Sequence, residues 1–201
     1  IITRSAYSGA QRYTSSWTGD NVASWEHLWI ANIQMQRMSI SGMGFTGSDI
    51  GGFAEQPSGE LYARWIQLGV FHPFCRTHSS GDHGDQEPWS FDVDVINITR
   101  KFVQLRYQLL PYLYTMFWEY INDGVPMLKP LVYFDQEDPQ THYRTDEFIF
   151  GNQILVCPIL EPNAQGRRMY LPIGNWYNYW TDELVSGRKE LWVKTDYDQI
   201  Q

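Results

Sequence analysis

The sequence carries little positive charge and has no long hydrophobic run. Its 15 lysines and arginines face 23 aspartates and glutamates, so the formal net charge is −8. Nucleic acids attract proteins through lysine and arginine, and we therefore expect no nucleic-acid partner. No apolar run approaches the roughly 20 residues of a membrane helix, and no signal peptide is visible. Because the chain opens on Ile1 without an initiator methionine, we expect it to be a piece of a longer protein.

Cysteine is scarce as well. Cys75 and Cys157 could form one bond, but two cysteines in a chain of this length make no disulfide framework, and two buried free thiols are the favoured interpretation. One loop gathers four potential metal ligands, which are His78, Asp82, His83 and Asp85. Their spacing matches no standard zinc pattern, and a solvated loop explains them better. We therefore expect no metal ion and no other cofactor, and the sequence does not indicate a cellular compartment.

Aromatic residues, in contrast, are plentiful, with 9 tryptophans, 13 tyrosines and 10 phenylalanines. Aromatic rings build hydrophobic cores, and they also stack on the apolar faces of sugars. For any single ring the core is the favoured location. An aromatic cluster near the end of the chain is predicted to belong to a core, with a sugar-binding patch as the alternative; it comprises Trp176, Tyr177, Tyr179 and Trp180.

Residues 1–124 alternate between strand-like and helix-like patterns, as βα units do. Apolar residues at helical spacing predict helices over 23–38, 61–68 and 94–122, the last one kinked by Pro111 in its interior. Strands are predicted over 1–7, over 70–75 and in the glycine-rich run that ends at Asp49. Small and large residues alternate in that run, which suits the crowded interior of an α/β barrel.

The pattern changes after Gly124, where short β-rich runs replace the βα units. Proline, glycine, asparagine and aspartate separate these runs, as expected for turns between antiparallel strands. We predict a β-sandwich in this part and a domain boundary near Gly124. The six predicted strands cover 127–134, 148–150, 154–159, 168–171, 176–180 and 190–193.

Polar residues recur in the first part at the length of one βα unit. Asp49 follows Asp20 by 29 residues, and His78 follows Asp49 by 29 residues, while a (β/α)₈ barrel of about 250 residues uses about 31 per unit. Residues at this spacing would lie at the carboxyl ends of successive strands and converge on one pocket. Arg4 lies near the end of the first predicted strand and joins this group.

Such a pocket has the groups that cleave a glycosidic bond. Cleavage needs a proton for the leaving oxygen and a carboxylate on the other side of the sugar. Asp20, in a glycine-containing turn beside Trp17, fits the proton donor, and it would need burial or a second carboxylate nearby to keep its proton. Arg4, Asp49 and His78 fit the recognition of sugar hydroxyls through several hydrogen bonds.

Each of these residues also has a purely structural interpretation. Asp20 could cap the helix that follows it, because aspartate is a favoured N-cap. Asp49 could hold an Asx-turn in its glycine-rich loop. Arg76 could pair with a buried carboxylate for structural reasons alone.

Several motifs, in order, resemble glycoside hydrolase family 31, the α-glucosidase and α-xylosidase family. The segment Trp17-Thr18-Gly19-Asp20-Asn21 resembles its acid/base signature. Nearly the whole chain takes part in the resemblance. The other matching segments are Thr3-Arg4-Ser5, Phe45–Phe53, Phe74–His78, Phe150–Ile159 and Tyr170–Tyr177.

The resemblance implies a fold and two domains. It implies the C-terminal portion of a (β/α)₈ TIM barrel in residues 1–124, followed by an antiparallel β-sandwich domain in residues 125–201. The nucleophile of the family is an aspartate in an Asp-Met-Asn-Glu-like motif on an earlier barrel strand. No such motif exists in this chain. The missing N-terminal part of the same enzyme would supply the nucleophile, and the 201-residue piece alone would be inactive.

The resemblance also implies roles for seven residues. Asp20 would be the general acid/base, and Arg4, Asp49 and His78 would hold the sugar in subsite −1. Trp17 and Phe53 would wall the pocket, and Arg76 would support the nucleophile side. The whole enzyme would be a retaining α-glycosidase, most simply an α-glucosidase acting on an α-glucoside. The alternatives are an α-xylosidase, an α-transglucosylase and a catalytically silent sugar-binding fragment.

Overall fold

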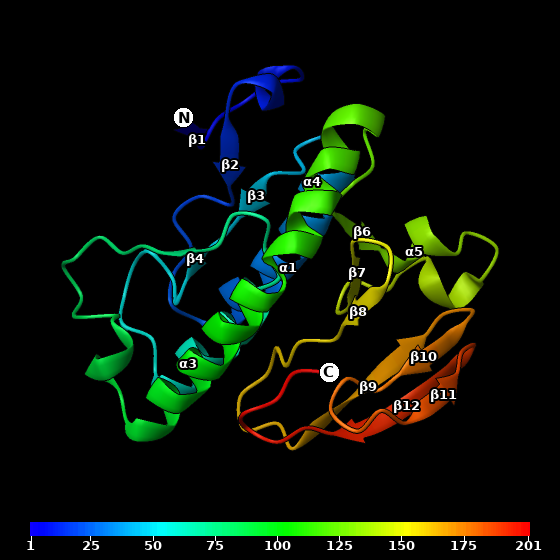
Figure 1. The fold of residues 1–201 in the computed structure, drawn as a ribbon. Coiled ribbons are helices and arrows are strands. Elements are labelled where there is room, and N and C mark those ends of the chain that lie inside the picture. The colour runs from blue at the N-terminus through cyan, green and yellow to red at the C-terminus, as the bar shows by residue number, and fades with distance from the viewer.

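The computed structural model describes all residues, 1–201, and begins with short parallel strands (Figure 1). β1 (Ile2–Thr3), β2 (Ser15–Trp17) and β3 (Thr46–Gly47) form one sheet in that order, and β4 (Asp49–Ile50) pairs with β5 (Arg76–Thr77). All these pairs are parallel. Only Ser48 separates β3 from β4, so the strands follow one another around part of a barrel.

Four helices accompany these strands, and each predicted helix is present. α1 covers Trp25–Ile40, and α2 covers Gly59–Gly69. The third predicted helix is divided in two, α3 (Val93–Gln108) and α4 (Leu110–Asp123), with the break at Leu109. Pro111 lies in the first turn of α4, where its missing N–H costs nothing. The predicted kink is therefore a helix boundary.

The glycine-rich strand is as crowded as its sequence indicates. A Cβ placed on Gly47 would lie 1.8 Å from the carbonyl oxygen of Phe74. Phe74 donates its N–H to the carbonyl of Thr46 at 3.0 Å, which brings its backbone onto this strand. Only glycine fits between the two backbones at this point.

One predicted strand, residues 70–75, is wrong. After α2 ends, the N–H groups of Phe71 and His72 donate to the carbonyls of Leu68 and Gly69, and these bonds make turns instead of a strand. The strand follows as β5, Arg76–Thr77. Val70, Phe71 and His72 are buried because these turns lie in the core, so their apolar character did not indicate an extended backbone.

The second part is mostly antiparallel. β6 (Leu128–Pro130), β7 (Phe148–Phe150) and β8 (Ile154–Val156) form one sheet. Two further pairs join β9 (Gly166–Leu171) to β12 (Lys189–Lys194) and β10 (Asn175–Tyr177) to β11 (Leu184–Ser186). The second half of the strand predicted over 127–134 is a short helix, α5 (Leu131–Phe134), and β11 was not predicted. Three 3₁₀ turns complete the elements, at Ala10–Arg12, Pro88–Ser90 and Pro139–Thr141.

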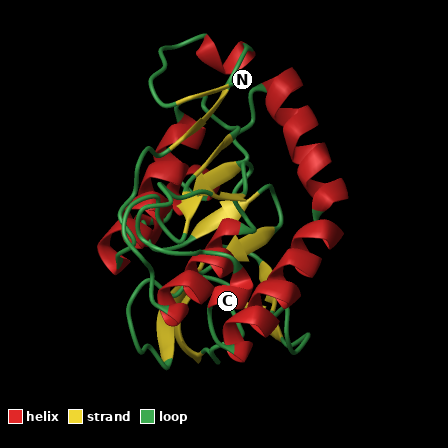
Figure 2. Ribbon diagram, turned by 90° about the vertical axis from the view of Figure 1, so that its left-hand side faces the viewer, coloured by secondary structure: helices red, strands yellow, loops and turns green.

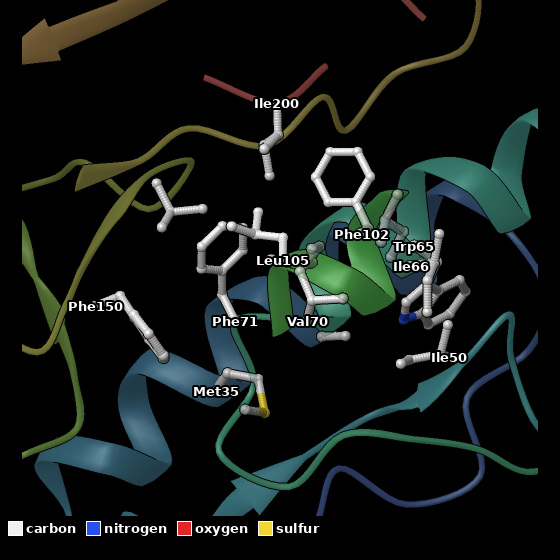
Figure 3. Close-up of a cluster of buried hydrophobic side chains, with 14 of the residues drawn as sticks. Met35, Ile50, Trp65, Ile66, Val70, Phe71, Phe102, Leu105, Phe150 and Ile200 are labelled. Carbon is white, nitrogen blue, oxygen red and sulfur yellow. The ribbon is translucent and has the colours of Figure 1, made fainter. Parts of the chain in front are cut away.

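One hydrophobic core of 25 buried residues joins the two parts (Figure 3). It includes Met35 and Trp65 from the first part and Phe150 and Ile200 from the second. Figure 3 shows Ile200 directed toward Phe71 and Leu105, and all three line a small apolar cavity of about 60 Å³. The two parts are thus packed together, and a division at Gly124 stays a prediction.

A tyrosine on α4 ties the two parts together. The Tyr112 hydroxyl donates to the carbonyl of Phe150 at 3.1 Å and accepts the N–H groups of Asn152 at 2.9 Å and Gln153 at 3.2 Å. Phe150 ends β7, and Asn152 and Gln153 lie in the turn between β7 and β8. None of the helices is both long enough and apolar enough to span a bilayer.

Candidate functional site

The turn that carries Asp20 is held by the residues around it. Gly19 has a φ of +89°, a conformation that side chains rarely adopt. The Thr18 hydroxyl donates to Asn21 Oδ1 at 2.5 Å, and the carbonyl of Asn21 accepts the N–H of Phe53 at 2.7 Å. These bonds fix Asp20 between β2 and the loop after β4. Asn21 is buried and organises both loops, although the sequence indicated no separate role for it.

Asp20 does not cap helix α1. The N-cap is Ser24, whose hydroxyl accepts the N–H of His27 at 3.2 Å. The Asp20 carboxylate instead accepts a hydrogen bond from Arg4 Nη1 at 2.6 Å. Both side chains are open to solvent, at 42% for Asp20 and 60% for Arg4. The expected burial of Asp20 beside Trp17 is therefore not found, because these 201 residues leave one side of the carboxyl uncovered.

Asp49 is fully buried and pairs with Arg76 across two parallel strands. Its Oδ1 accepts from Arg76 Nε at 3.1 Å and from Nη2 at 2.9 Å. Burial raises the pKa of Asp49, while Arg76 and the charge of His78 lower it and the charge of Asp20 raises it. Asp49 lies in strand β4, not in an Asx-turn. Its second oxygen, Oδ2, is buried without a hydrogen-bond partner.

The aromatic residues lie next to these charged groups. The Arg76 guanidinium lies over the ring of Trp17, 5.3 Å from the ring centroid. The rings of Phe53 and His78 are 5.4 Å apart between centroids. Like Asp49 Oδ2, the Trp17 Nε1 group is buried without a partner. These two atoms lie on β2 and β4, and a polar ligand that reached them would satisfy both.

The structure places the predicted residues in or next to the parallel strands. Arg4 follows β1, Asp20 follows β2, Asp49 begins β4, and Arg76 begins β5 with His78 just after it. Arg4 pairs with Asp20, Arg76 pairs with Asp49, and the charges of Asp20 and His78 act on Asp49, while their convergence on one pocket stays a prediction. A polar cavity of about 380 Å³ lies elsewhere, beside Asp94 and Tyr197. The candidate residues lie on a face that is partly open to solvent.

Two buried side chains, Trp65 and His72, hold the backbone next to Asp49, and the sequence indicated no such role for either. The Trp65 Nε1 group donates to the Ser48 hydroxyl at 3.0 Å. His72 Nδ1 lies 3.4 Å from the same hydroxyl and accepts the Ser48 N–H at 3.5 Å. Ser48 directly precedes Asp49, so these contacts fix the backbone that carries the carboxylate. The only sequence signal for this role of His72 is that it lies two residues before the Phe74–His78 segment.

His72 stays uncharged in the fold. It is completely buried, and burial, with a smaller effect of the Arg106 charge, lowers its pKa to about 3. The unfolded chain binds a proton at this histidine below about pH 6.5. Between these two values the unfolded state binds more protons than the folded state, so His72 weakens the fold as the pH falls through that range.

We expect His72→Leu to destabilise the intact protein by about 1–3 kcal/mol at pH 7, because Ser48 loses its buried acceptor. His72→Asn keeps an acceptor oxygen and should cost less. The difference in unfolding free energy between His72→Asn and the parent should also shrink as the pH falls from 7 to 4. The parent is weakened by protonation of His72 in the unfolded state, and asparagine takes up no proton. Denaturant unfolding at several pH values measures both effects. A difference in unfolding free energy between His72→Asn and the parent that grows on acidification would contradict this account.

Neither cysteine is in a disulfide, and Cys157 is buried. No three histidine, cysteine, aspartate or glutamate side chains are close enough to share a metal ion. Asp49 has the Arg76 guanidinium and, beside that, the rings of Trp17, Phe53 and His78 near it, and such a set suits a neutral polyhydroxyl ligand.

Comparison with known proteins identifies two family matches that together cover most of the chain. Residues 1–116 match the family profile described as "Glycosyl hydrolases family 31 TIM-barrel domain". Residues 124–201 match the profile described as "Glycosyl hydrolase family 31 C-terminal domain". The expected fold class, part of a TIM barrel followed by antiparallel β structure, is confirmed.

Individual relatives agree with these matches. The chain is 40% identical to "Alpha-glucosidase 2" of Bacillus thermoamyloliquefaciens over all of its own length and 25% of that protein. It is 31% identical to a glucosidase II alpha subunit whose crystal structure is described as Glc1Man2-bound, with a TM-score of 0.95, covering 100% of this chain and 22% of that one. The cycloalternan-degrading enzyme from Trueperella pyogenes, in complex with a covalent intermediate, is 27% identical with a TM-score of 0.95, over 99% of this chain and 29% of that one. The chain thus spans less than a third of the length of these relatives.

Proposed function

Because the chain belongs to glycoside hydrolase family 31, we propose that it carries the acid/base half of the active site of a retaining α-glycosidase. The whole enzyme would remove terminal α-linked glucosyl residues by double displacement. The observation that carries this proposal is the placement of two carboxylates on the parallel strands, Asp20 in the turn after β2 and Asp49 in β4, close enough for the charge of Asp20 to act on Asp49. Each is paired with an arginine, at 2.6 Å and 2.9 Å respectively.

Asp20 is the proposed proton donor. It lies in a turn fixed by Asn21, and its carboxyl is reachable from solvent. In the first step it would give its proton to the leaving oxygen, and in the second it would take a proton from the attacking water. The portion of the protein that precedes Ile1 would enclose it, which keeps an acid protonated more readily.

Asp49, Arg4 and His78 are the proposed ligands of the sugar in subsite −1. Asp49 Oδ2 has no partner in the fold, so a sugar hydroxyl that donates to it would satisfy a buried carboxylate oxygen. Arg76 holds the other oxygen and orients the carboxylate. Trp17 and Phe53 would form the walls, where aromatic faces pack against the sugar ring.

The nucleophile would come from outside this chain. No Asp-Met-Asn-Glu-like segment is present in the 201 residues, and the chain spans only 25% of the Bacillus relative. The crystal structure of the Trueperella enzyme holds a covalent intermediate, which supports a covalent step in this chain's own enzyme as well. The partners of the chain would therefore be an α-glucoside substrate and the missing N-terminal part of the same protein.

Relatives favour glucose over xylose as the sugar. The Bacillus relative is named an alpha-glucosidase, and the glucosidase II relative is named a glucosidase. An α-xylosidase or an α-transglucosylase would use the same seven residues with a different pocket or acceptor. A silent sugar-binding protein is less favoured, because the Trp17–Asn21 segment keeps its carboxylate in an accessible turn.

The test is hydrolysis by the full-length protein of matched α-glucosyl and α-xylosyl aryl substrates. We expect the glucosyl substrate to have the higher kcat/KM and the product to keep the α configuration. Product analysis at high sugar concentration separates hydrolysis from transglycosylation. The 201-residue chain assayed alone should be inactive, and normal activity of this piece would refute the external nucleophile.

A further inference from the structure

A glutamine in the loop after β5 is buried, although the loop around it is exposed. Residues 81–85 and Glu87 are open to solvent, while Gln86 is only 5% exposed. Glutamine is mostly a surface residue, because its amide loses hydrogen bonds to water when it is buried. The burial of Gln86 therefore requires a partner inside the fold.

The partner of Gln86 is the backbone of the loop after β4. Its Nε2 group donates to the carbonyl of Gly52 at 2.9 Å, and its Oε1 is buried without a partner. Gly51 leaves room for the amide, since a Cβ on Gly51 would lie 3.0 Å from Gln86 Oε1. Gly51 and Gly52 both have a φ of +89°, which other residues rarely adopt. Gln86 thus reaches from one loop to the next and binds a tight glycine turn.

This turn carries Phe53, the proposed wall of the sugar pocket. The Phe53 N–H donates to the carbonyl of Asn21 at 2.7 Å, and the Phe53 carbonyl accepts the N–H of Ser80 at 2.9 Å. Asn21 follows Asp20, and Ser80 lies two residues after His78. The rings of Phe53 and His78 are 5.4 Å apart between centroids. Phe53 therefore links the loop of Asp20 to the loop of His78.

A second glutamine makes the same kind of contact in the opposite direction. Gln56, in the loop after β4, donates from Nε2 to the carbonyl of Asp85 at 2.8 Å. Figure 1 shows the loop after β5 reaching outward on the left, and Figure 2 looks at this side, where loops cross in front of the strands. Gln56 is exposed, so water competes for its bond, whereas Gln86 is shielded from water. Gln86 is therefore the stronger of the two contacts.

We propose that Gln86 is a positioning residue of the sugar pocket: it holds the Gly52–Phe53 peptide, and this peptide holds His78 in place. Gln86 acts through these residues and makes no contact with the sugar. The inference rests on the proposed function, in which Phe53 walls subsite −1 and His78 binds the sugar there. Without the amide the glycine turn is free to shift, and misplacement of a binding group by 1 Å costs up to about 10²-fold in rate.

Gln36 offers a matched control, because it is a buried glutamine with a comparable bond elsewhere. It lies on α1 at 3% exposure, and its Nε2 donates to the carbonyl of Thr145 at 3.1 Å. Methionine at either position keeps the length of the side chain and removes the amide. We expect Gln86→Met and Gln36→Met to lower the midpoint of thermal unfolding of the intact protein by similar amounts, a few degrees each.

Kinetics of the intact enzyme on an activated α-glucosyl aryl substrate separate the two variants. We expect Gln86→Met to lower kcat/KM about 10-fold and Gln36→Met to leave it within about two-fold. The effect of Gln86→Met should fall below about two-fold in an enzyme whose Phe53 and His78 are already alanine, because the amide acts through them. An equal loss in both backgrounds, or equal losses for the two methionine variants, would overturn the proposal.

Hydrogen exchange gives a readout that needs no activity. Mass spectrometry of the intact protein should show amide exchange over 52–54 and 78–85 at least several-fold faster in Gln86→Met, and unchanged there in Gln36→Met. Unchanged exchange over both segments in Gln86→Met would refute the positioning role, whatever the enzyme hydrolyses. A parent protein that hydrolyses no α-glycoside, with the expected exchange in Gln86→Met, would refute the proposed function and leave the hold of Gln86 on Phe53 standing.

Discussion

Replacement of Asp20 by asparagine should reduce kcat/KM of the intact enzyme by about 10²–10⁴-fold on glucosides with a poor leaving group. The loss should be far smaller on activated aryl glucosides, whose leaving groups depart without a proton. Asparagine keeps the size of the side chain and can still accept a bond from Arg4, which now lies 2.6 Å from the carboxylate. The change thus removes the transferable proton and the charge that pairs with Arg4, and keeps the shape of the side chain.

A series of aryl glucosides with leaving groups of graded acidity measures this effect. The slope of log kcat/KM against leaving-group pKa should steepen in the Asp20→Asn enzyme. Asp82→Asn is the matched control, because Asp82 is also an exposed aspartate in a loop of the first part. A uniform loss across the series, or no loss, would remove Asp20 from the role of acid.

Gly47→Ala should be the most disruptive small substitution in this chain. The added Cβ would lie 1.8 Å from the carbonyl oxygen of Phe74, a backbone atom that cannot rotate away. Separating β3 from the segment before β5 should cost about 3 kcal/mol or more. In a domain of 150–250 residues this corresponds to roughly 6–12 °C in the midpoint of thermal unfolding. Activity should fall too, because Asp49 lies just beyond the displaced strand.

The control for Gly47→Ala is Gly81→Ala. Gly81 has nothing within 4 Å of an added Cβ, but its φ is +80°. That substitution therefore measures backbone strain without a clash, and we expect it to cost about 1 kcal/mol. Gly47 has no positive φ, so its cost would come from the clash alone. Similar costs for the two variants would mean that the strands can move apart easily.

The periodic parts of the chain were predictable from the sequence. The helix predicted over 23–38 is α1, because its apolar residues recur at helical spacing and Ser24 caps it. Equal spacing placed Asp20 and His78 just after strands β2 and β5, whereas Asp49 lies within β4. The helix depends on local repetition, which a single sequence shows directly.

Other features depend on contacts that the sequence does not display. The run 70–75 is apolar because its turns are buried in the core, and apolar character alone cannot separate a buried turn from a strand. His72 supports Ser48 across 24 residues of chain. The exposure of Asp20 depends on what packs beside it, which the pattern of a single sequence does not show.

The Tyr112 hydroxyl has a practical consequence for anyone who engineers this protein. Its three hydrogen bonds, to Phe150, Asn152 and Gln153, join α4 and the β part into one rigid unit. A chimera that exchanges the β part at Gly124 would keep Tyr112 but replace the turn that it binds. It would also divide the buried core that the two parts share. Recombination with a homologue should therefore place its crossover before α3, so that the helix, Tyr112 and the turn come from the same parent protein.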